Sequence, residues 1–303
     1  MATTEYTQEF LDRGGDRLGL QVYPDTPDSP VVVIWPAMGV PARYYRPFAR
    51  ELTAEGLSVV VVDLRGTGTS TPGPSRRSRY GYTELTGDVG AVLEALKPRT
   101  DGRRVILLGH SLGGQICALY LAVTEDTGVD GLALVAVGLP WYRSYPGRHG
   151  IGVLAFTQAI AAVSAVLGVW PGWGFGGRQA RGVIRDWGYT ARHGTFPAID
   201  GTDMEAALAR MVKPVLAISV DDDQYTPPAT LDQLCAKMSA APVQRAHLTA
   251  FEAGARIDHV KWVRASSTVA ARISAFAHTD GWQSSSETVA EVKDGRGAGT
   301  LLP

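Results

Sequence analysis

Apolar residues follow two kinds of pattern along this chain of 303 residues. Short continuous runs rich in β-branched residues predict strands that are covered on both faces. These runs lie at 31–35, 57–64, 104–108, 132–137, 213–220 and about 243–249. Segments with apolar residues at helical spacing lie at 43–56, 83–97, 112–124, 229–239 and about 260–277. Because strands and helices alternate, we expect a mostly parallel sheet with right-handed crossovers, flanked by helices.

The alternation of strands and helices begins only after residue 30 and is interrupted once. The first 30 residues predict an opening pair of strands that are joined by a glycine turn and end in a Pro-rich loop. Residues 138–205 are rich in Trp, Gly, Arg and Pro and show no sheet pattern. We therefore expect a core made of residues 1–137 and 206–279, with 138–205 inserted as a cap. The polar tail 280–303 is expected to be poorly ordered.

Composition excludes several classes of protein. The net charge of −1 and the pI of about 6.6 do not indicate nucleic acid or an acidic membrane surface as a partner. The two cysteines, Cys117 and Cys235, lack metal-ligand spacing and are expected to be reduced. The N-terminal residues lack the basic and apolar regions of a signal peptide, so a cytoplasmic location is expected.

One uncharged segment, 151–170, is long enough to cross a bilayer. A single span there would place the two halves of the α/β pattern on opposite sides of a membrane. We therefore expect no membrane span, and a buried or cleft-covering helix in its place.

The strongest chemical signal is Gly109-His110-Ser111-Leu112-Gly113, which fits G-x-S-x-G between a predicted strand and a predicted helix. In that context the serine lies on a strained turn that exposes its hydroxyl at the carboxyl edge of the sheet. Glycines two residues before and after it avoid clashes with the neighbouring backbone. The sequence therefore predicts that Ser111 is a nucleophile.

A serine hydroxyl needs a base, and the base needs an orienting acid. At such an elbow the acid and then the histidine follow the serine along the chain. Strand 213–220 runs into three adjacent candidate acids, Asp221, Asp222 and Asp223. His259 lies in a loop before a predicted helix and is the preferred base, whereas His247 falls within the last predicted strand and is expected to be structural.

Acyl transfer also needs an oxyanion hole. One donor is expected from the backbone N–H of Leu112, the residue after the nucleophile. The second is expected from the loop after strand 31–35, where Met38 is the first candidate and Ala37 the next. That loop lacks the usual His-Gly, but a backbone donor does not depend on the side chain.

These pieces resemble the α/β-hydrolase superfamily, and more narrowly the bacterial α/β hydrolases related to serine aminopeptidases and acylglycerol lipases. The resemblance spans residues 31 to about 262. It is carried by PAMGVPARYYRPFA, VVVVDLRGTGTS, VILLGHSLGGQ, DDDQYTPP and IDHVKW.

The resemblance implies an α/β-hydrolase fold with an inserted cap over the active site. In this superfamily the acid commonly lies four residues before a proline, which favours Asp223, before Pro227, over Asp222. The family histidine usually follows a small residue, whereas Asp258 precedes His259 here.

Aromatic residues in the cap suit an apolar ligand pocket. The candidate substrate-binding residues are Trp141, Tyr142, Phe156, Trp173 and Trp187. They predict a small-molecule ester with an apolar acyl or alcohol part.

Other motifs give weaker evidence for a functional site. The glycines of 66–68 lack the spacing and the helix of a dinucleotide loop. The basic cluster Arg76, Arg77 and Arg79 is read as a solvated loop. Without a metal-binding motif, neither a metal nor another cofactor is expected.

The leading hypothesis is thus a serine hydrolase of carboxylic esters, thioesters or lactones. An acyltransferase, lyase or cyclase using the same site, or a ligand-binding protein with a silent triad, remain as alternatives. The sequence does not indicate an oligomeric state.

Overall fold

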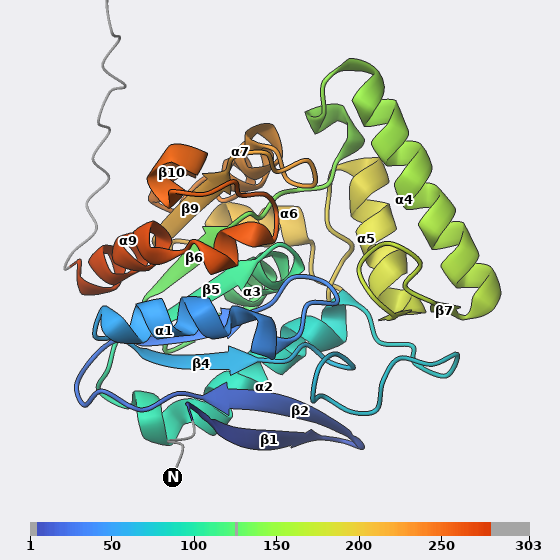
Figure 1. Ribbon diagram of the computed structural model, residues 1–303. Helices are drawn as coiled ribbons and strands as arrows, with labels where there is room; N and C mark the ends of the chain where they lie inside the picture. The colour runs from blue at the N-terminus through green and yellow to red at the C-terminus, as the bar shows by residue number, and fades with distance from the viewer. Residues whose placement is uncertain (1–4, 125–126, 280–303) are drawn as a thin grey trace, which may run out of the picture.

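The computed structural model describes residues 5–124 and 127–279, so the predicted tail lies outside the described residues. An eight-stranded sheet forms the centre of the molecule (Figure 1), in the order β1-β2-β4-β3-β5-β6-β9-β10. Its strands are β1 (Thr7–Arg13), β2 (Asp16–Val22), β3 (Val31–Trp35), β4 (Ser58–Val62), β5 (Val105–His110), β6 (Gly131–Val135), β9 (Val215–Val220) and β10 (Val243–Leu248). The first two strands are antiparallel and the six from β4 to β10 run parallel, as expected.

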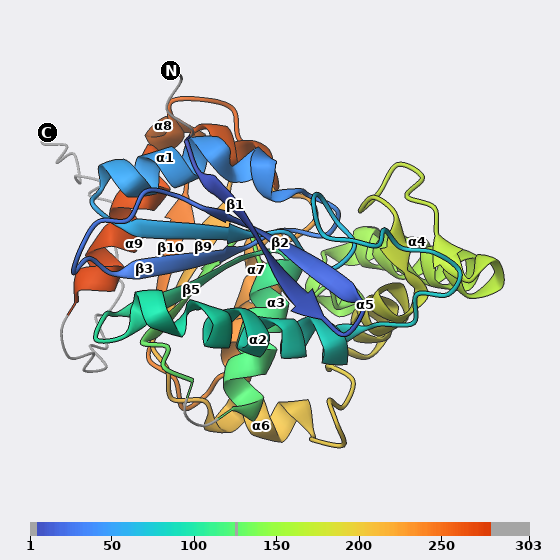
Figure 2. The ribbon, with the colours of Figure 1, turned by 90° about the horizontal axis from the view of Figure 1, so that it is seen from below.

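Helices cover both faces of the sheet (Figure 2). The elements are η1 (Ala42–Tyr45), α1 (Arg46–Ala54), α2 (Tyr82–Thr100), α3 (Leu112–Val123), α6 (Met204–Arg210), α7 (Pro228–Lys237), α8 (Ala250–Ala253), η3 (Lys261–Arg264) and α9 (Ser267–His278). α1 and α9 pack on one face, whereas α2, α3, α6 and α7 pack on the other. All five residues of β3 are buried, with Val32 and Ile34 in one core and Val31, Val33 and Trp35 in the other.

The prediction of a single helix over about 260–277 is wrong. This segment is divided into η3 and α9, and Ala265 between them adopts φ −131° and ψ 58°. The side chain of Asp258 accepts the backbone N–H groups of Val260 and Lys261, which starts the first turn early. The Ser266 hydroxyl donates to the carbonyl of Val263 (3.1 Å) at the break.

Two further helices stand beyond the carboxyl edge of the sheet. η2 (Tyr142–Ser144), α4 (Gly147–Leu167), β7 (Val169–Trp170), β8 (Gln179–Ala180) and α5 (Arg181–His193) form this part of the molecule (Figure 1). β7 and β8 pair with each other and not with the central sheet. The chain then returns to the core, because Phe196, Ile199 and Met204 pack in the same apolar cluster as α2 and α3. We therefore propose that the cap ends near residue 195 and not at 205.

Candidate active site

The turn after β5 holds Ser111 in an unusual conformation. Its φ is 53° and its ψ is −120°, a backbone region that L-residues seldom adopt. The neighbouring glycines make this turn possible. A Cβ on Gly109 would lie 2.1 Å from the Cα of Gly114, and one on Gly113 would lie 2.0 Å from the carbonyl oxygen of Trp35. The turn therefore brings the start of α3 against the loop that follows β3.

The structure brings Ser111, His259 and Asp223 together from three distant parts of the chain. The Ser111 Oγ lies 3.1 Å from Nε2 of His259. The other ring nitrogen of His259, Nδ1, lies 2.9 Å from Oδ2 of Asp223. Both partners are largely shielded, since His259 is 9% exposed and Asp223 is 6% exposed. Hydroxyl, imidazole and carboxylate thus form one continuous hydrogen-bonded chain.

The Asp223 carboxylate is held by the turn that it begins. Its Oδ1 accepts the backbone N–H groups of Tyr225 (2.9 Å) and Thr226 (2.8 Å). Its Oδ2 accepts the Thr226 hydroxyl (2.6 Å) as well as contacting His259. These bonds fix the carboxylate while it faces the imidazole. Thr226 is a supporting residue that the sequence reading did not identify.

The other two aspartates lie elsewhere. Asp222 is exposed and has a positive φ of 54°. Asp221 accepts the backbone N–H of Ala250 (2.8 Å) and contacts Nε2 of His247 (2.8 Å). The Ala250 N–H, and then His247, lower the pKa of Asp221 below its usual value. The geometry thus joins only Asp223 of the three to His259.

The loop after β3, which is predicted to supply an oxyanion donor, is fixed by a buried phenol. The backbone N–H of Ala37 donates to the Tyr45 hydroxyl (2.9 Å), and that hydroxyl lies 2.7 Å from Nδ1 of His110. The N–H of Ala37 therefore already has an acceptor and is not free to donate to an oxyanion. The N–H of Met38 has no acceptor in the part of the chain that the structure describes. As the first residue of α3, Leu112 has a backbone N–H without an intrahelical partner.

His110 is fully buried. Burial, and second the electrostatic influence of the neighbouring His259, hold the pKa of His110 well below its usual value. Its ring also packs edge-on against Trp262, with ring centroids 5.3 Å apart. The sequence pattern did not indicate the contact between Tyr45 and His110, because it joins residues 65 positions apart.

A cavity of about 650 Å³ opens in front of Ser111 and reaches the cap. Met38, Asp222 and His259 line it on the core side. Its apolar wall comes from Tyr145, Val153, Phe156, Phe175, Trp187 and Tyr225. The rings of Phe175 and Trp187 stack with centroids 5.0 Å apart.

Only two of the five predicted substrate-binding aromatics, Phe156 and Trp187, line this cavity. Trp141 packs against the core, and its ring atoms lie close to Gly194. The Tyr142 hydroxyl accepts from Arg143, and Trp173 is 66% exposed. These three side chains therefore do not line the cavity, contrary to expectation. Some aromatic residues of the cap face the cavity and others do not, and the irregular sequence pattern does not reveal which.

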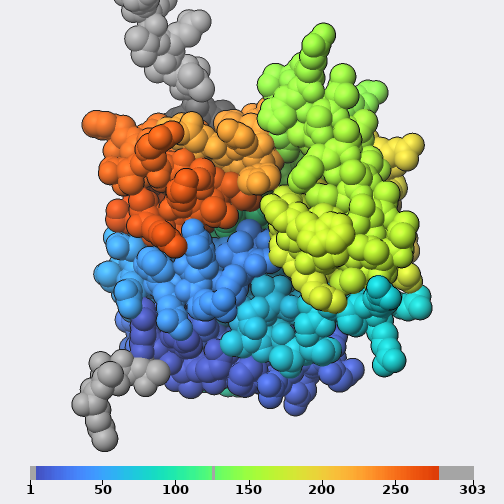
Figure 3. Space-filling view, turned by 45° about the vertical axis from the view of Figure 1, so that its right-hand side comes forward, coloured from blue at the N-terminus to red at the C-terminus, as the bar shows by residue number. Residues whose placement is uncertain are grey.

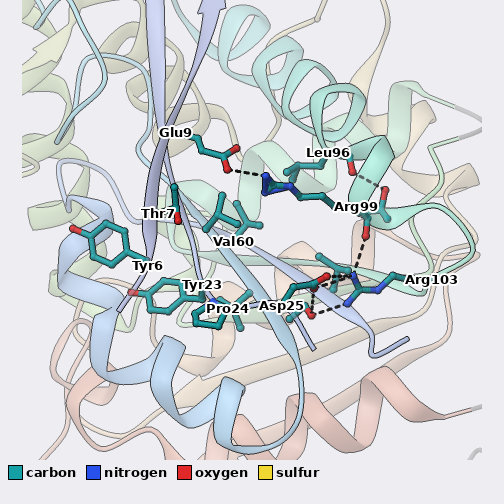
Figure 4. A pocket seen from close by; sticks show the side chains of 15 residues that line it. Tyr6, Thr7, Glu9, Tyr23, Pro24, Asp25, Val60, Leu96, Arg99 and Arg103 are labelled. Atoms are coloured by element: carbon teal, nitrogen blue, oxygen red, sulfur yellow. Dashed lines mark hydrogen bonds and ion pairs between the residues drawn. The ribbon is translucent and has the colours of Figure 1, made fainter. Parts of the chain in front are cut away.

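A second cavity, of about 400 Å³, lies between β1, β2 and the end of α2, and shares no lining residue with the first (Figure 4). Its charged groups satisfy one another. Arg99 pairs with Glu9 (2.7 Å), while Arg103 donates to Asp25 (2.9 Å) and to the Ser58 hydroxyl (2.6 Å). These pairs fasten the N-terminal strands to the core.

Comparison with known proteins agrees with this architecture. The chain is 35% identical over 97 residues to the AB hydrolase superfamily protein YisY of Bacillus subtilis, a match that covers 32% of this chain and 34% of that protein. It is 26% identical over 255 residues to a monoacylglycerol lipase of Mycolicibacterium smegmatis, covering 76% of this chain and 83% of the lipase.

Among solved structures, the enol-lactonase of Burkholderia xenovorans has the same fold. The TM-score is 0.58 at 19% identity, and the match covers 88% of this chain and 99% of the lactonase. The family model described as serine aminopeptidase, S33, matches residues 26–186. Because this match covers more than half of the 303 residues, the chain belongs to the serine aminopeptidase S33 family of α/β hydrolases.

Proposed function

We propose that this protein is a serine hydrolase of carboxylic esters, thioesters or lactones with an apolar acyl or alcohol part. The observation that carries the proposal is the hydrogen-bonded chain from the Ser111 hydroxyl through His259 to Asp223. A serine next to a neutral imidazole can lose its proton as it attacks a carbonyl. The ester and lactone chemistry in the names of the lipase and lactonase relatives is of the same class.

In the acylation step, Ser111 Oγ attacks the carbonyl carbon of the ester while Nε2 of His259 takes the hydroxyl proton. Asp223 holds the ring orientation through Nδ1 and stabilises the imidazolium. The backbone N–H groups of Met38 and Leu112 stabilise the negative oxygen of the tetrahedral intermediate. His259 then returns the proton to the leaving alcohol, and an acyl-enzyme on Ser111 remains.

In the deacylation step, a water molecule takes the place of the alcohol. His259 removes its proton, the oxygen attacks the acyl carbon, and the carboxylic acid leaves as Ser111 regains its proton. The apolar wall with Phe156, Phe175 and Trp187 is proposed to hold the acyl or alcohol chain.

Replacement of Ser111 by Ala should lower kcat for a soluble 4-nitrophenyl ester by about a million-fold, since losses within such a triad act as a unit. Ser219→Ala is a matched control, because the Ser219 hydroxyl also touches a histidine, 2.8 Å from Nδ1 of His247, yet is buried and lines neither cavity. It should retain wild-type kcat. Activity that survives in Ser111→Ala would contradict the mechanism.

The same assay decides between hydrolysis and acyl transfer. Adding alcohol and amine acceptors should leave the yield of free carboxylic acid dominant if water is the natural acceptor. A product mixture dominated by the transferred acyl group at millimolar acceptor would instead assign the site to an acyltransferase.

A further inference from the structure

α4 exposes apolar residues and buries polar ones, the reverse of the usual arrangement in a helix on the surface of a globular protein. Its buried residues are Gly150, Thr157, Ile160 and Ser164, of which two are polar. Its outer side carries Ile151 (65% exposed) and Val166 (84%), with alanines between them. A surface helix normally buries its apolar stripe and exposes its polar one. The reversed arrangement indicates that the outer face of α4 meets an apolar medium.

The apolar surface continues past the end of the helix. From Gly150 to Gly177 the chain contains no Asp, Glu, Lys or Arg. Trp173, in the turn after β7, is 66% exposed and packs edge-on against Trp170. Figure 3 shows this segment, in green to yellow, standing out from the body of the molecule. An exposed indole beside an apolar face is typical of residues at a membrane–water boundary.

Arginines flank this face at both ends. Arg143 and Arg148 are exposed where α4 begins. At its other end lies the loop of residues 70–80, in which Arg76 and Arg77 are exposed and Arg76 lies close to Gly168. None of these four has an acidic partner within residues 5–124 and 127–279. The near-zero net charge of the whole chain thus hides a local excess of positive charge.

We propose that the outer face of α4, together with the turn around Trp173, docks on the surface of a bilayer that contains anionic lipids. An apolar helix face enters the boundary between headgroups and acyl chains, and the flanking arginines pair with negative headgroups. α4 lies on the bilayer and does not cross it. Both of its ends join elements of one folded body, and its Gln158 side chain donates to the carbonyl of Gly188 in α5 (2.9 Å).

A second copy of the chain fits this face less well. In a two-fold symmetric dimer built on α4, each face meets its own copy, so the unpaired arginines at its rim would gather without acidic partners. An anionic bilayer supplies both the apolar medium and the opposite charge.

Docking in this way would bring the substrate cavity to the lipid. The inner side of the same elements lines that cavity, through Val153 and Phe156 of α4 and Phe175 of the following turn. An apolar ester could then pass from the bilayer to Ser111 without crossing bulk water. This consequence rests on the proposed function, whereas the docking itself does not.

Flotation of the full chain with vesicles tests the proposal. The probes are vesicles of phosphatidylcholine alone and vesicles of phosphatidylcholine with phosphatidylglycerol. The protein should float with the anionic vesicles and release at high salt, because raising the ionic strength from about 0.1 to about 1 M shortens the Debye length from about 10 to about 3 Å. The double variant Ile151→Glu/Val166→Glu should bind about tenfold or more weakly.

Phe251→Glu is the matched control, because Phe251 is 95% exposed on α8, outside the cap. It should float like the wild type. The double variant should keep its turnover of a soluble short-chain ester, since neither residue lines the cavity. Failure of the wild type to float, or equal binding by the double variant, would overturn the docking proposal. So would a concentration-dependent dimer that the double variant abolishes without any vesicle binding. Loss of ester turnover in the wild type would instead count against the proposed function alone.

Discussion

At the scale of single residues, the site depends on backbone positions as much as on side chains. Ser111 has a positive φ, in a turn that glycines on either side make possible. The Tyr45 hydroxyl accepts a hydrogen bond from the backbone N–H of Ala37. The Tyr45 hydroxyl also contacts His110, the residue just before Ser111. One buried phenol therefore links the two segments that are proposed to supply the oxyanion donors. We infer that it sets their separation.

Removing this hydroxyl should impair catalysis more than substrate binding. Tyr45→Phe leaves the N–H of Ala37 without its acceptor and frees the loop that carries Met38. Loss of a whole oxyanion donor lowers kcat by about 100- to 1,000-fold, so displacement of one should lower it by about 10- to 100-fold with little change in KM. Steady-state kinetics on a soluble ester measure this split.

Tyr80→Phe is the control for that variant, because it also removes a phenol hydroxyl, one that donates to the carbonyl of Arg65 (3.0 Å) away from the elbow. It should leave kcat near the wild-type value. Equal kcat values for Tyr45→Phe and Tyr80→Phe would show that the bond to Ala37 does not position the oxyanion loop.

At the scale of elements, the apolar pattern predicted the parallel strands closely. β3 matches the expected range of 31–35, because a run of β-branched residues that is buried on both faces has few alternatives. The prediction of one last helix was wrong because hydrogen bonds that involve the side chains of Asp258 and Ser266 decide where a helix starts or breaks. Apolar periodicity does not reveal these hydrogen bonds. α6 was missed because it has only seven residues.

The elements are also joined by a buried ion pair that should contribute strongly to stability. Asp88 of α2, whose side chain is 1% exposed, accepts from Arg65 after β4 and from Arg13 of β1. Asp88→Asn should lower the free energy of unfolding by about 3–5 kcal/mol, because it leaves the buried charge of Arg65 without its main partner. Urea denaturation at neutral pH measures the change.

Asp232→Asn provides the comparison, since Asp232 is 60% exposed in its pair with Arg245. Exposed pairs contribute about 0–1 kcal/mol, so this variant should unfold near the wild-type midpoint. A loss below about 1 kcal/mol for Asp88→Asn would mean that the buried pair matters no more than the exposed one.

At the scale of the whole molecule, the proposed active site is assembled from segments that are far apart in sequence. Chain order and the common carboxyl edge of the parallel strands favoured Ser111, His259 and one of the three aspartates, whereas the preference for Asp223 came from the family resemblance. The lining of the cap could not be predicted, because the sequence of an irregular segment does not reveal which aromatic side chains face inward. Trp173 on its outer surface is the clearest example.

The central claim is that Ser111 becomes covalently acylated with the help of His259. The most direct test is mass spectrometry of the full chain after treatment with a fluorophosphonate, which forms a stable adduct on an activated serine. A single adduct should form and map to the peptide that contains Ser111, while His259→Gln should react far more slowly. An unmodified wild-type protein, or an adduct on another serine, would contradict the account.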